Sequence, residues 1–159
     1  MKLFLIQKMK IMSEQMPREE LEKEVLNFFR KRGELVLCTC SDNIPRATPM
    51  DFYTDKASFN IYVGLTPGRK LRNIEENPVV SIGIYTPIKL EGKVQGMQIT
   101  ATGKERLILL RPGDPEFENA QAIVRGKRKL ILKIIPEKIE LLDYDFPKRG
   151  YAIFQCLEL

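Results

Sequence analysis

The chain of 159 residues contains no histidine and no tryptophan. Without histidine it cannot form a serine–histidine–aspartate triad, an imidazole general base, or a metal or haem site that uses histidine ligands. It also lacks a Gly-x-Gly-x-x-Gly segment, the fingerprint of a dinucleotide-binding unit. No side chain stands out as a general acid or base, so catalysis by this chain would depend on a bound cofactor.

The sequence has three cysteines, Cys38, Cys40 and Cys156. An odd number in mainly apolar surroundings argues against a disulfide framework, and a Cys-x-Cys pair alone is too little for a metal site. We therefore expect no metal, and buried, unreactive thiols that pack as small apolar side chains. The scarcity of cysteine also predicts a cytoplasmic protein.

Long hydrophobic runs are absent as well. A membrane-spanning helix needs about 20 apolar residues, and the apolar run Leu3–Ile6 is also too short for the core of a signal peptide. Residues 1–16 are therefore interpreted as an N-terminal extension, and no membrane association is expected. The composition, 43% hydrophobic and 30% charged, is typical of a soluble globular protein. The length predicts a single domain over residues 1–159.

Positive charge is in moderate excess, with a net charge of +5. This excess fits an anionic ligand or a polyanion and does not choose between them. The densest basic run, Arg125–Lys129, lacks the interleaved aromatic side chains of a nucleic-acid site. We interpret it as a solvated loop and do not expect nucleic acid as a partner.

Hydrophobic periodicity predicts one long helix followed by many short strands. In Pro17–Arg32, the apolar residues Leu21, Val25 and Phe28 recur at helical spacing, and Gly33 is expected to end the helix. A second helix is expected over Pro115–Arg125. The strand-like segments are Glu34–Cys40, Arg46–Tyr53, Ser58–Val63, Val79–Tyr85, Met97–Leu110 (one long strand or a pair bent at Gly103), Lys129–Ile135, Lys138–Asp143 and Tyr151–Leu157. This order predicts a mainly β, α+β fold: an antiparallel barrel with helices at its mouths.

A short helix is expected between two of these strands, with Thr66 as its N-cap and Asn77-Pro78 as its stop. Its first turn carries Arg69 and Lys70, which opposes the helix dipole. An anion at this helix start would resolve the conflict, because free backbone N–H groups and two cations form a phosphate site. The alternative is a surface helix whose charges face water.

Three local patterns, in this order and spacing, resemble the flavin-binding split barrels related to pyridoxamine 5′-phosphate oxidase. They are Arg46–Asp51, then Arg69-Lys70 followed by Asn73–Ser81, and Gln98–Gly103. The resemblance implies a six-stranded antiparallel split β-barrel with flanking helices. It also implies a homodimer that holds flavin mononucleotide (FMN) at its interface.

The resemblance also assigns roles to residues. On this analogy Arg46, Arg69 and Lys70 bind the 5′-phosphate. Gln98 contacts the cofactor, either of its own subunit or of the other subunit of the dimer. The remaining cofactor-binding residues implied or expected are Thr48, Pro49, Met50 and Asp51 along the ring edge and Thr66 and Gly68 beside the phosphate. Without the resemblance, Arg46, Pro49 and Gln98 would be interpreted as a surface charge, an edge-strand proline and a surface strand residue.

Two departures from the family limit the expected substrate. True pyridoxamine phosphate oxidases carry a lysine near the position of Asp51 and an Arg-Leu-His signature near the C-terminus, whereas this chain has no histidine. We therefore expect a flavin-dependent oxidoreductase acting on an unidentified small molecule and not on pyridoxamine phosphate. The lack of histidine also disfavours the haem-handling branch. The alternatives are a reductase that uses deazaflavin (F420) and a non-catalytic flavin or electron carrier.

Overall fold

The structure, a computed structural model, describes residues 14–55, 57–85 and 94–159, so most of the predicted N-terminal extension lies outside the described residues. The helical elements are α2 (Arg18–Arg30), α3 (Arg69–Glu76), α5 (Phe117–Ile123) and the short 3-10 helix η1 (Phe146–Arg149). The strands are β1 (Glu34–Ser41), β2 (Ile44–Asp51), β3 (Tyr53–Thr54), β4 (Ile61–Gly64), β5 (Val79–Tyr85), β6 (Gln95–Thr102), β7 (Leu107–Leu110), β8 (Ile131–Ile134), β9 (Lys138–Asp143) and β10 (Phe154–Glu158).

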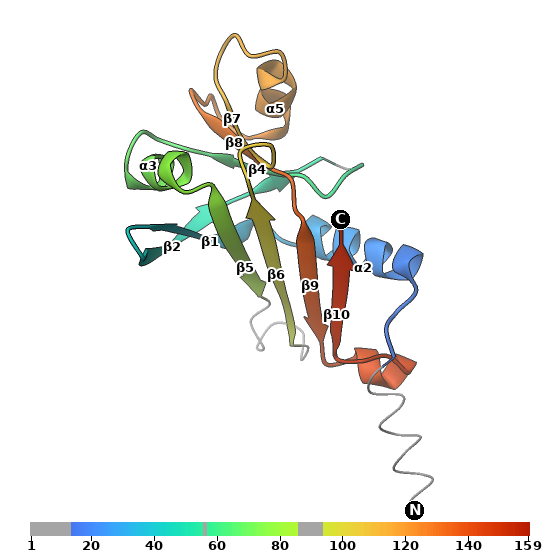
Figure 1. The fold of residues 1–159 in the computed structure, drawn as a ribbon. Helices are drawn as coiled ribbons and strands as arrows, with labels where there is room; N and C mark the ends of the chain where they lie inside the picture. Colours follow the sequence, from blue (N-terminus) through green and yellow to red (C-terminus); the bar gives the residue numbers. More distant parts are fainter. Residues whose placement is uncertain (1–13, 56, 86–93) are drawn as a thin grey trace, which may run out of the picture.

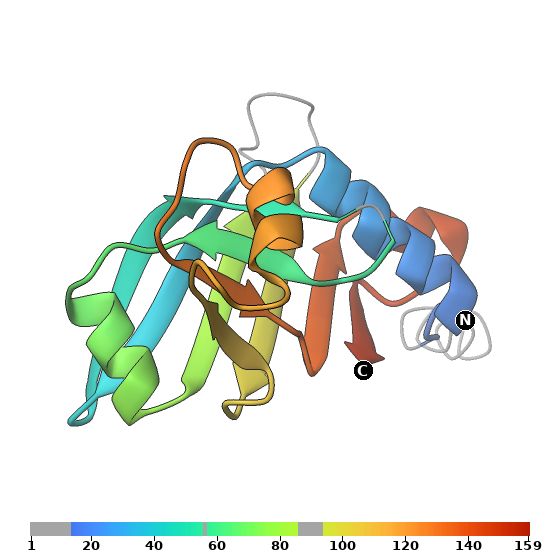
Figure 2. The same ribbon diagram turned by 90° about the horizontal axis from the view of Figure 1, so that it is seen from above.

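The strands form two antiparallel sheets (Figure 1), in the order β10-β9-β6-β5-β1-β2 and β3-β4-β8-β7. Seen from above, α2 lies at one end of the larger sheet and α3 lies at the other, beside the β1–β2 hairpin (Figure 2). Apolar side chains of α2 and of both sheets share one main hydrophobic core. The predicted mainly β fold with a six-stranded antiparallel sheet is confirmed. The chain changes sheets after β2, so β4 pairs with β3 and β8 in the smaller sheet and not with β2.

One predicted strand start moves because a local turn competes with the sheet. The carboxylate of Asp55 accepts hydrogen bonds from the backbone N–H groups of Ala57 (3.0 Å) and Ser58 (2.6 Å), so the turn persists and β4 begins only at Ile61. Gly103, with φ of 99°, separates β6 from β7, which confirms the bent pair. Helix α2 ends with Lys31 as its C-cap, two residues before the expected Gly33.

The three cysteines are free, but they are less buried than expected. Cys38 and Cys40 are half-buried because they lie on the outer face of β1, while the alternating residues Leu37 and Thr39 face inward. Cys156 is exposed as a residue. Partial desolvation of its thiol and a hydrogen bond to Glu158 raise the pKa of that thiol. The prediction that the thiols are buried is therefore wrong. Alternation along a strand does not identify which face of the sheet is covered.

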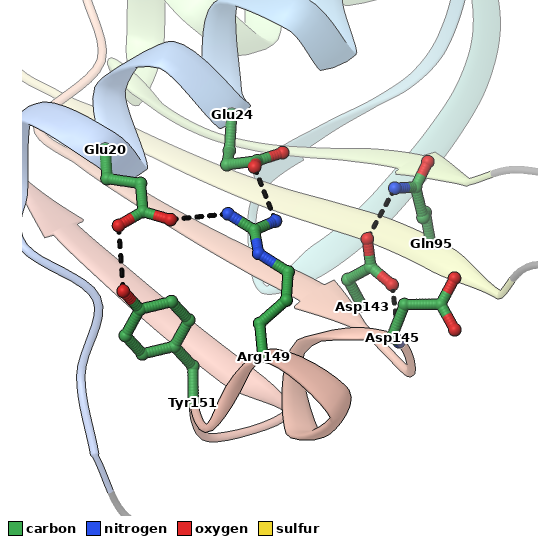
Figure 3. A network of polar contacts seen from close by, with 7 residues as sticks. All are labelled: Glu20, Glu24, Gln95, Asp143, Asp145, Arg149 and Tyr151. Atoms are coloured by element: carbon green, nitrogen blue, oxygen red, sulfur yellow. Dashed lines mark hydrogen bonds and ion pairs between the residues drawn. The ribbon is translucent and has the colours of Figure 1, made fainter.

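A polar cluster fastens the end of the chain to α2 (Figure 3). Arg149 Nη1 donates to Glu24 Oε1 (2.6 Å), and Arg149 Nη2 donates to Glu20 Oε1 (2.5 Å). The Tyr151 hydroxyl donates to the other oxygen of Glu20 (2.8 Å). Nearby, the buried Asp143 carboxylate accepts from Gln95 Nε2 (2.6 Å) and from the backbone N–H of Asp145 (2.7 Å). The contacts of Arg149 and Tyr151 thus join α2 to the segment after β9, which is far from it in the sequence, and the Gln95 contact joins β6 to the end of β9.

None of the described helices is long and apolar enough to cross a membrane. Within residues 14–55, 57–85 and 94–159, no group of three or more cysteine and acidic side chains could hold a metal ion.

The cluster around Glu20 predicts a pH-dependent contribution to stability. The hydrogen bonds donated by Tyr151 and Arg149 lower the pKa of the Glu20 carboxyl below its ordinary value of 4.5. Because the folded pKa is the lower one, this contribution is present above pH 4.5 and is lost as the pH falls through the folded pKa. Glu20→Gln should therefore lower the melting temperature at pH 7, and its difference from wild type should shrink below pH 4.5.

The matched control is Glu19→Gln, since Glu19 lies in the same first turn of α2 and has the same relation to the helix dipole. Thermal unfolding followed by circular dichroism at several pH values measures both variants. A deficit that is equal for the two variants, or that does not change with pH, would contradict the role assigned to the Glu20 cluster.

Candidate functional site

Two polar hollows lie side by side along β2, and Thr48 and Lys70 line both of them. The first hollow has a volume of about 490 Å³ and is lined by Thr39, Pro45, Arg46, Ala47, Thr48, Arg69, Lys70 and Asn73. The second has a volume of about 240 Å³ and is lined by Thr48, Pro49, Met50, Asp51, Tyr53, Gly64, Thr66, Lys70 and Arg128. We call them the α3 hollow and the β4 hollow after the elements that face β2 in each.

Strand β2 is the edge of the larger sheet, and its hairpin turn determines which backbone groups stay free. Asp42 and Asn43 both have positive φ, 51° and 59°, as a two-residue type I′ turn requires. The flanking pair Ser41–Ile44 is then hydrogen-bonded, and every second pair along the ladder is hydrogen-bonded with it.

This alternation explains the two prolines of β2. Pro45 and Pro49 fall on the intervening pairs, where the backbone nitrogen points toward the free edge, so neither removes a bond of the ladder. Pro49 therefore does not interrupt strand pairing, since β2 pairs with β1 through Pro49 and as far as Asp51. The free edge still offers backbone groups of Ala47, Pro49 and Asp51 to a ligand in the hollows.

Hydrogen bonds fasten α3 to β1, and this attachment forms the wall of the α3 hollow. The buried Asn73 donates from its Nδ2 to the hydroxyl of the equally buried Thr39 (3.0 Å). Asn77 Nδ2 donates to the backbone oxygen of Cys40 (3.0 Å), and the Ser41 hydroxyl donates to Glu76 (2.5 Å). The acidic end of the helix is thus held against the hairpin, which turns its basic start toward β2.

The start of α3 differs in one respect from the sequence prediction. The helix begins at Arg69 with Gly68 as its N-cap, and no side chain caps it. Thr66 is therefore not the cap but lines the β4 hollow. The backbone N–H groups of the first turn thus keep their capacity to bind an anion.

Three cations converge on the α3 hollow, namely Arg46 from β2 and Arg69 and Lys70 from α3. Within the part of the chain that the structure describes, no ion pair or side-chain hydrogen bond joins any of them to another residue. The helix's acidic residue Glu75, by contrast, pairs with Arg111 (3.6 Å). The hollow is therefore a site of uncompensated positive charge, which suits an anionic ligand.

The structure brings together eight of the ten predicted cofactor-binding residues around the two hollows: Arg46, Thr48, Pro49, Met50, Asp51, Thr66, Arg69 and Lys70. Gly68 is exposed and lines neither hollow, although it is the N-cap of α3. Gln98 lies on the outer face of β6, where its amide nitrogen is 3.4 Å from the Ser81 hydroxyl. On one chain, Gln98 is therefore not part of the hollows.

Several residues that line the hollows were not predicted from the sequence. Thr39 and Asn73 form the wall between β1 and α3, and Tyr53 and Arg128 line the β4 hollow. Arg128 belongs to the basic run that was interpreted as a solvated loop. The other three basic residues of that run are exposed, and Arg128 alone of the four turns inward, which no local sequence signal indicates.

A third hollow, mainly apolar and of about 470 Å³, lies on the outer face of the larger sheet. Tyr85 and Phe154 border it with 71% and 63% of their surfaces exposed. Its other apolar lining residues include Val36, Cys38 and Leu142. Gln98 lines the same hollow. Large exposed apolar side chains grouped in this way mark a surface that another molecule covers.

The sequence matches the family described as pyridoxamine 5′-phosphate oxidase over residues 21–143, which is most of the chain. The chain therefore belongs to this family, and the resemblance inferred from its motifs is confirmed. No curated protein matches the sequence.

Solved structures with the same fold bind different cofactors. The FAD-binding protein of Mycobacterium smegmatis is 14% identical with a TM-score of 0.59, over 77% of this chain and 95% of its own. General Stress Protein 26 of Bacillus anthracis is 18% identical with a TM-score of 0.59, over 87% and 98%. A haem-binding protein of Mycobacterium smegmatis is 13% identical with a TM-score of 0.60, over 85% and 56%. These similarities establish the fold, and the ligand must be argued from the site.

The hydrogen bond between Asn73 and Thr39 should be measurable as a coupling free energy in a double-mutant cycle. Asn73→Ala or Thr39→Val alone leaves a buried polar group without its partner, which should cost about 1–3 kcal/mol of unfolding free energy. The double variant should cost clearly less than the sum of the two. Urea unfolding provides the free energies, with Asn27→Ala on the exposed face of α2 as a control expected within about 0.5 kcal/mol of wild type. Additive losses would contradict the coupling.

Proposed function

We propose that this protein is a flavin-dependent oxidoreductase that holds FMN in the hollows along β2. The observation that carries the proposal is the convergence of Arg46, Arg69 and Lys70 on the α3 hollow with no acidic partner among the described residues. The 5′-phosphate of FMN carries close to two negative charges at neutral pH, as phosphate monoesters do. Three cations and the uncapped start of α3 suit such a group.

The second element of the proposal is the free edge of β2. The pyrimidine half of a flavin ring needs hydrogen-bond donors and acceptors, and the unpaired backbone groups of Ala47, Pro49 and Asp51 are of this kind. When bound, the flavin supplies the hydride or electron transfer, and the chain supplies its position and the surrounding charge. Residues Thr48 and Met50, on the inner face of β2, would orient the ring between the two hollows.

The choice of FMN over the dinucleotide rests on what the site lacks. The sequence contains no Gly-x-Gly-x-x-Gly element for a pyrophosphate, and the α3 hollow forms one compact group of cations. Pyridoxamine phosphate is not the proposed substrate, because Asp51 stands where the oxidases have a lysine.

We propose further that two copies of the chain pair through the outer face of the larger sheet. The exposed apolar side chains Tyr85 and Phe154 favour this, since a second copy would remove them from water. Pairing would also account for Gln98, which is on the same outer face and could reach a cofactor held by the partner subunit. A complete flavin site would then need both subunits.

The phosphate role is tested by Lys70→Ala. Loss of one charge-assisted contact of roughly 1.5–3 kcal/mol should weaken FMN binding by about tenfold to a hundredfold. Riboflavin, which lacks the phosphate, should bind almost as before. Quenching of flavin fluorescence gives both affinities.

Arg72→Ala is the matched control, because Arg72 is an exposed cation on the same helix and lines neither hollow. It should leave both affinities nearly unchanged. Equal losses of FMN and riboflavin in Lys70→Ala would mean that Lys70 supports the ring or the fold. No loss of affinity for FMN or for riboflavin would mean that the cations of α3 face water and bind no phosphate.

The dimer is tested by Phe154→Asp, which places a charge within the exposed apolar group without disturbing a buried side chain. Sedimentation velocity should show a dimer for wild type and a shift toward monomer for the variant, with weaker FMN binding at the same protein concentration. Tyr144→Asp, at another exposed aromatic residue that does not line the hollow, should remain dimeric. A wild-type monomer at micromolar concentration would contradict the proposal.

A further inference from the structure

Arg128 reaches the β4 hollow from the loop after α5, and it does not line the α3 hollow, where the FMN phosphate is proposed to bind. Its side chain lies over the backbone of Gly64 at the end of β4, so closely that a Cβ atom at residue 64 would come within 2.7 Å of Arg128 Nε. Only glycine at position 64 leaves this path open without a shift of the arginine. The guanidinium thereby lies against the same hollow as Thr66, Lys70 and Asp51.

The loop that carries Arg128 is held by one glutamine. Gln121 of α5 accepts a hydrogen bond from the backbone N–H of Arg128 (2.8 Å), and its amide nitrogen donates to the backbone oxygen of Gly126 (2.8 Å). The arginine is thus presented from a fixed backbone position. Fixing the backbone lowers the conformational entropy that a ligand contact would otherwise cost.

The Arg128 side chain also has unused hydrogen-bonding capacity. Its Nε is buried, and in the described part of the chain it has no hydrogen-bond partner. Asp51 lines the same hollow, yet no ion pair joins it to Arg128 or Lys70 among these residues. A buried donor left in this state is costly unless a ligand satisfies it.

We propose that Arg128, Thr66 and Lys70 form a second oxyanion subsite next to the FMN phosphate site. The subsite takes a phosphate or carboxylate group, for which the planar guanidinium offers two parallel donors. Two cations outweigh the single carboxylate of Asp51 in this hollow, so its net charge favours an anion. The inference deepens the proposed function and rests on it for the identity of the neighbouring ligand.

The oxyanion has two chemically equivalent sources. It belongs either to an anionic substrate or to the second phosphate of a dinucleotide flavin. Either source suits a site beside the α3 hollow, since the two hollows share Thr48 and Lys70. A comparison of FMN with FAD separates the two sources.

The test uses inorganic phosphate as the probe and compares Arg128→Gln with Lys127→Gln, a neighbouring exposed cation on the same loop. Phosphate added to the FMN-loaded wild type should change the flavin absorption spectrum in a saturable way. Arg128→Gln should raise the apparent dissociation constant for phosphate by about tenfold or more, and Lys127→Gln by less than about twofold. FMN affinity itself should change by less than about threefold in Arg128→Gln, because FMN has a single phosphate and the α3 hollow binds it.

The comparison of the two flavins identifies the source of the oxyanion. If Arg128→Gln weakens FAD binding but not FMN binding, and phosphate does not perturb the FAD-loaded protein, the oxyanion is the second phosphate of a dinucleotide. If both flavins bind unchanged and phosphate perturbs both complexes, it is a substrate group. Both results support the subsite.

Two results would overturn it. One is a phosphate titration that is the same in Arg128→Gln and wild type. The other is an equal loss of riboflavin and FMN in that variant, which would assign Arg128 to the ring. If wild type binds no flavin, the proposed function fails. The subsite is then tested in the flavin-free protein by NMR titration with phosphate. Shifts of the backbone amides of residues 66 and 128 in wild type, and their absence in Arg128→Gln, would support the subsite.

Discussion

The candidate site depends on the buried hydrogen bond between Asn73 and Thr39. Thr39 is the cross-strand partner of Arg46 in the β1–β2 ladder, and its hydroxyl accepts from the side chain of Asn73 on α3. One residue therefore fixes both the strand that carries Arg46 and the helix that carries Arg69 and Lys70. Both members of the bond are buried, so breaking it leaves a polar group without water or partner. The convergence of cations follows from this attachment.

Charge is distributed unevenly over the molecule. Arg149 shares two carboxylates of α2, Lys133 pairs with Glu116, and Arg111 pairs with Glu75. Exposed pairs of this kind contribute little stability, but they neutralise the surface locally. The cations of the two hollows have no such partners among the described residues, and their positive potential is left for a ligand. The acidic end of α3 is held by Arg111 and Ser41, which keeps Glu75 and Glu76 from neutralising the basic start of the same helix.

Much of this arrangement could be predicted from the sequence because it is encoded locally. The Asp42-Asn43 turn, the bend at Gly103 and the stop at Asn77-Pro78 are all set by residues with restricted or unusual backbone preferences. The sequence also shows that the start of α3 is basic, which is unfavourable toward the helix dipole unless an anion binds there. The assignment of Thr66 as the cap was wrong, since the chain enters the helix through Gly68. Cap positions are a local preference that the path of the preceding strand can override.

The remaining features depend on contacts between distant segments, which local patterns do not encode. Arg128 turns inward because Gly64, at the end of β4, leaves room for it, whereas Lys127 and Lys129 beside it stay in water. Alternation placed Cys38 and Cys40 on one face of β1 but could not tell that this face is the outer one. The same holds for Gln98, because the sequence could not tell that its face of β6 is the outer one, where it lines the apolar hollow.

The most direct test of the central claim is a crystal structure of the protein with FMN added. The account predicts a phosphate within hydrogen-bond distance of Arg69, Lys70 and Arg46 at the start of α3, with the ring along the free edge of β2. A flavin bound elsewhere, for example in the apolar hollow bordered by Tyr85 and Phe154 with its phosphate in solvent, would contradict it.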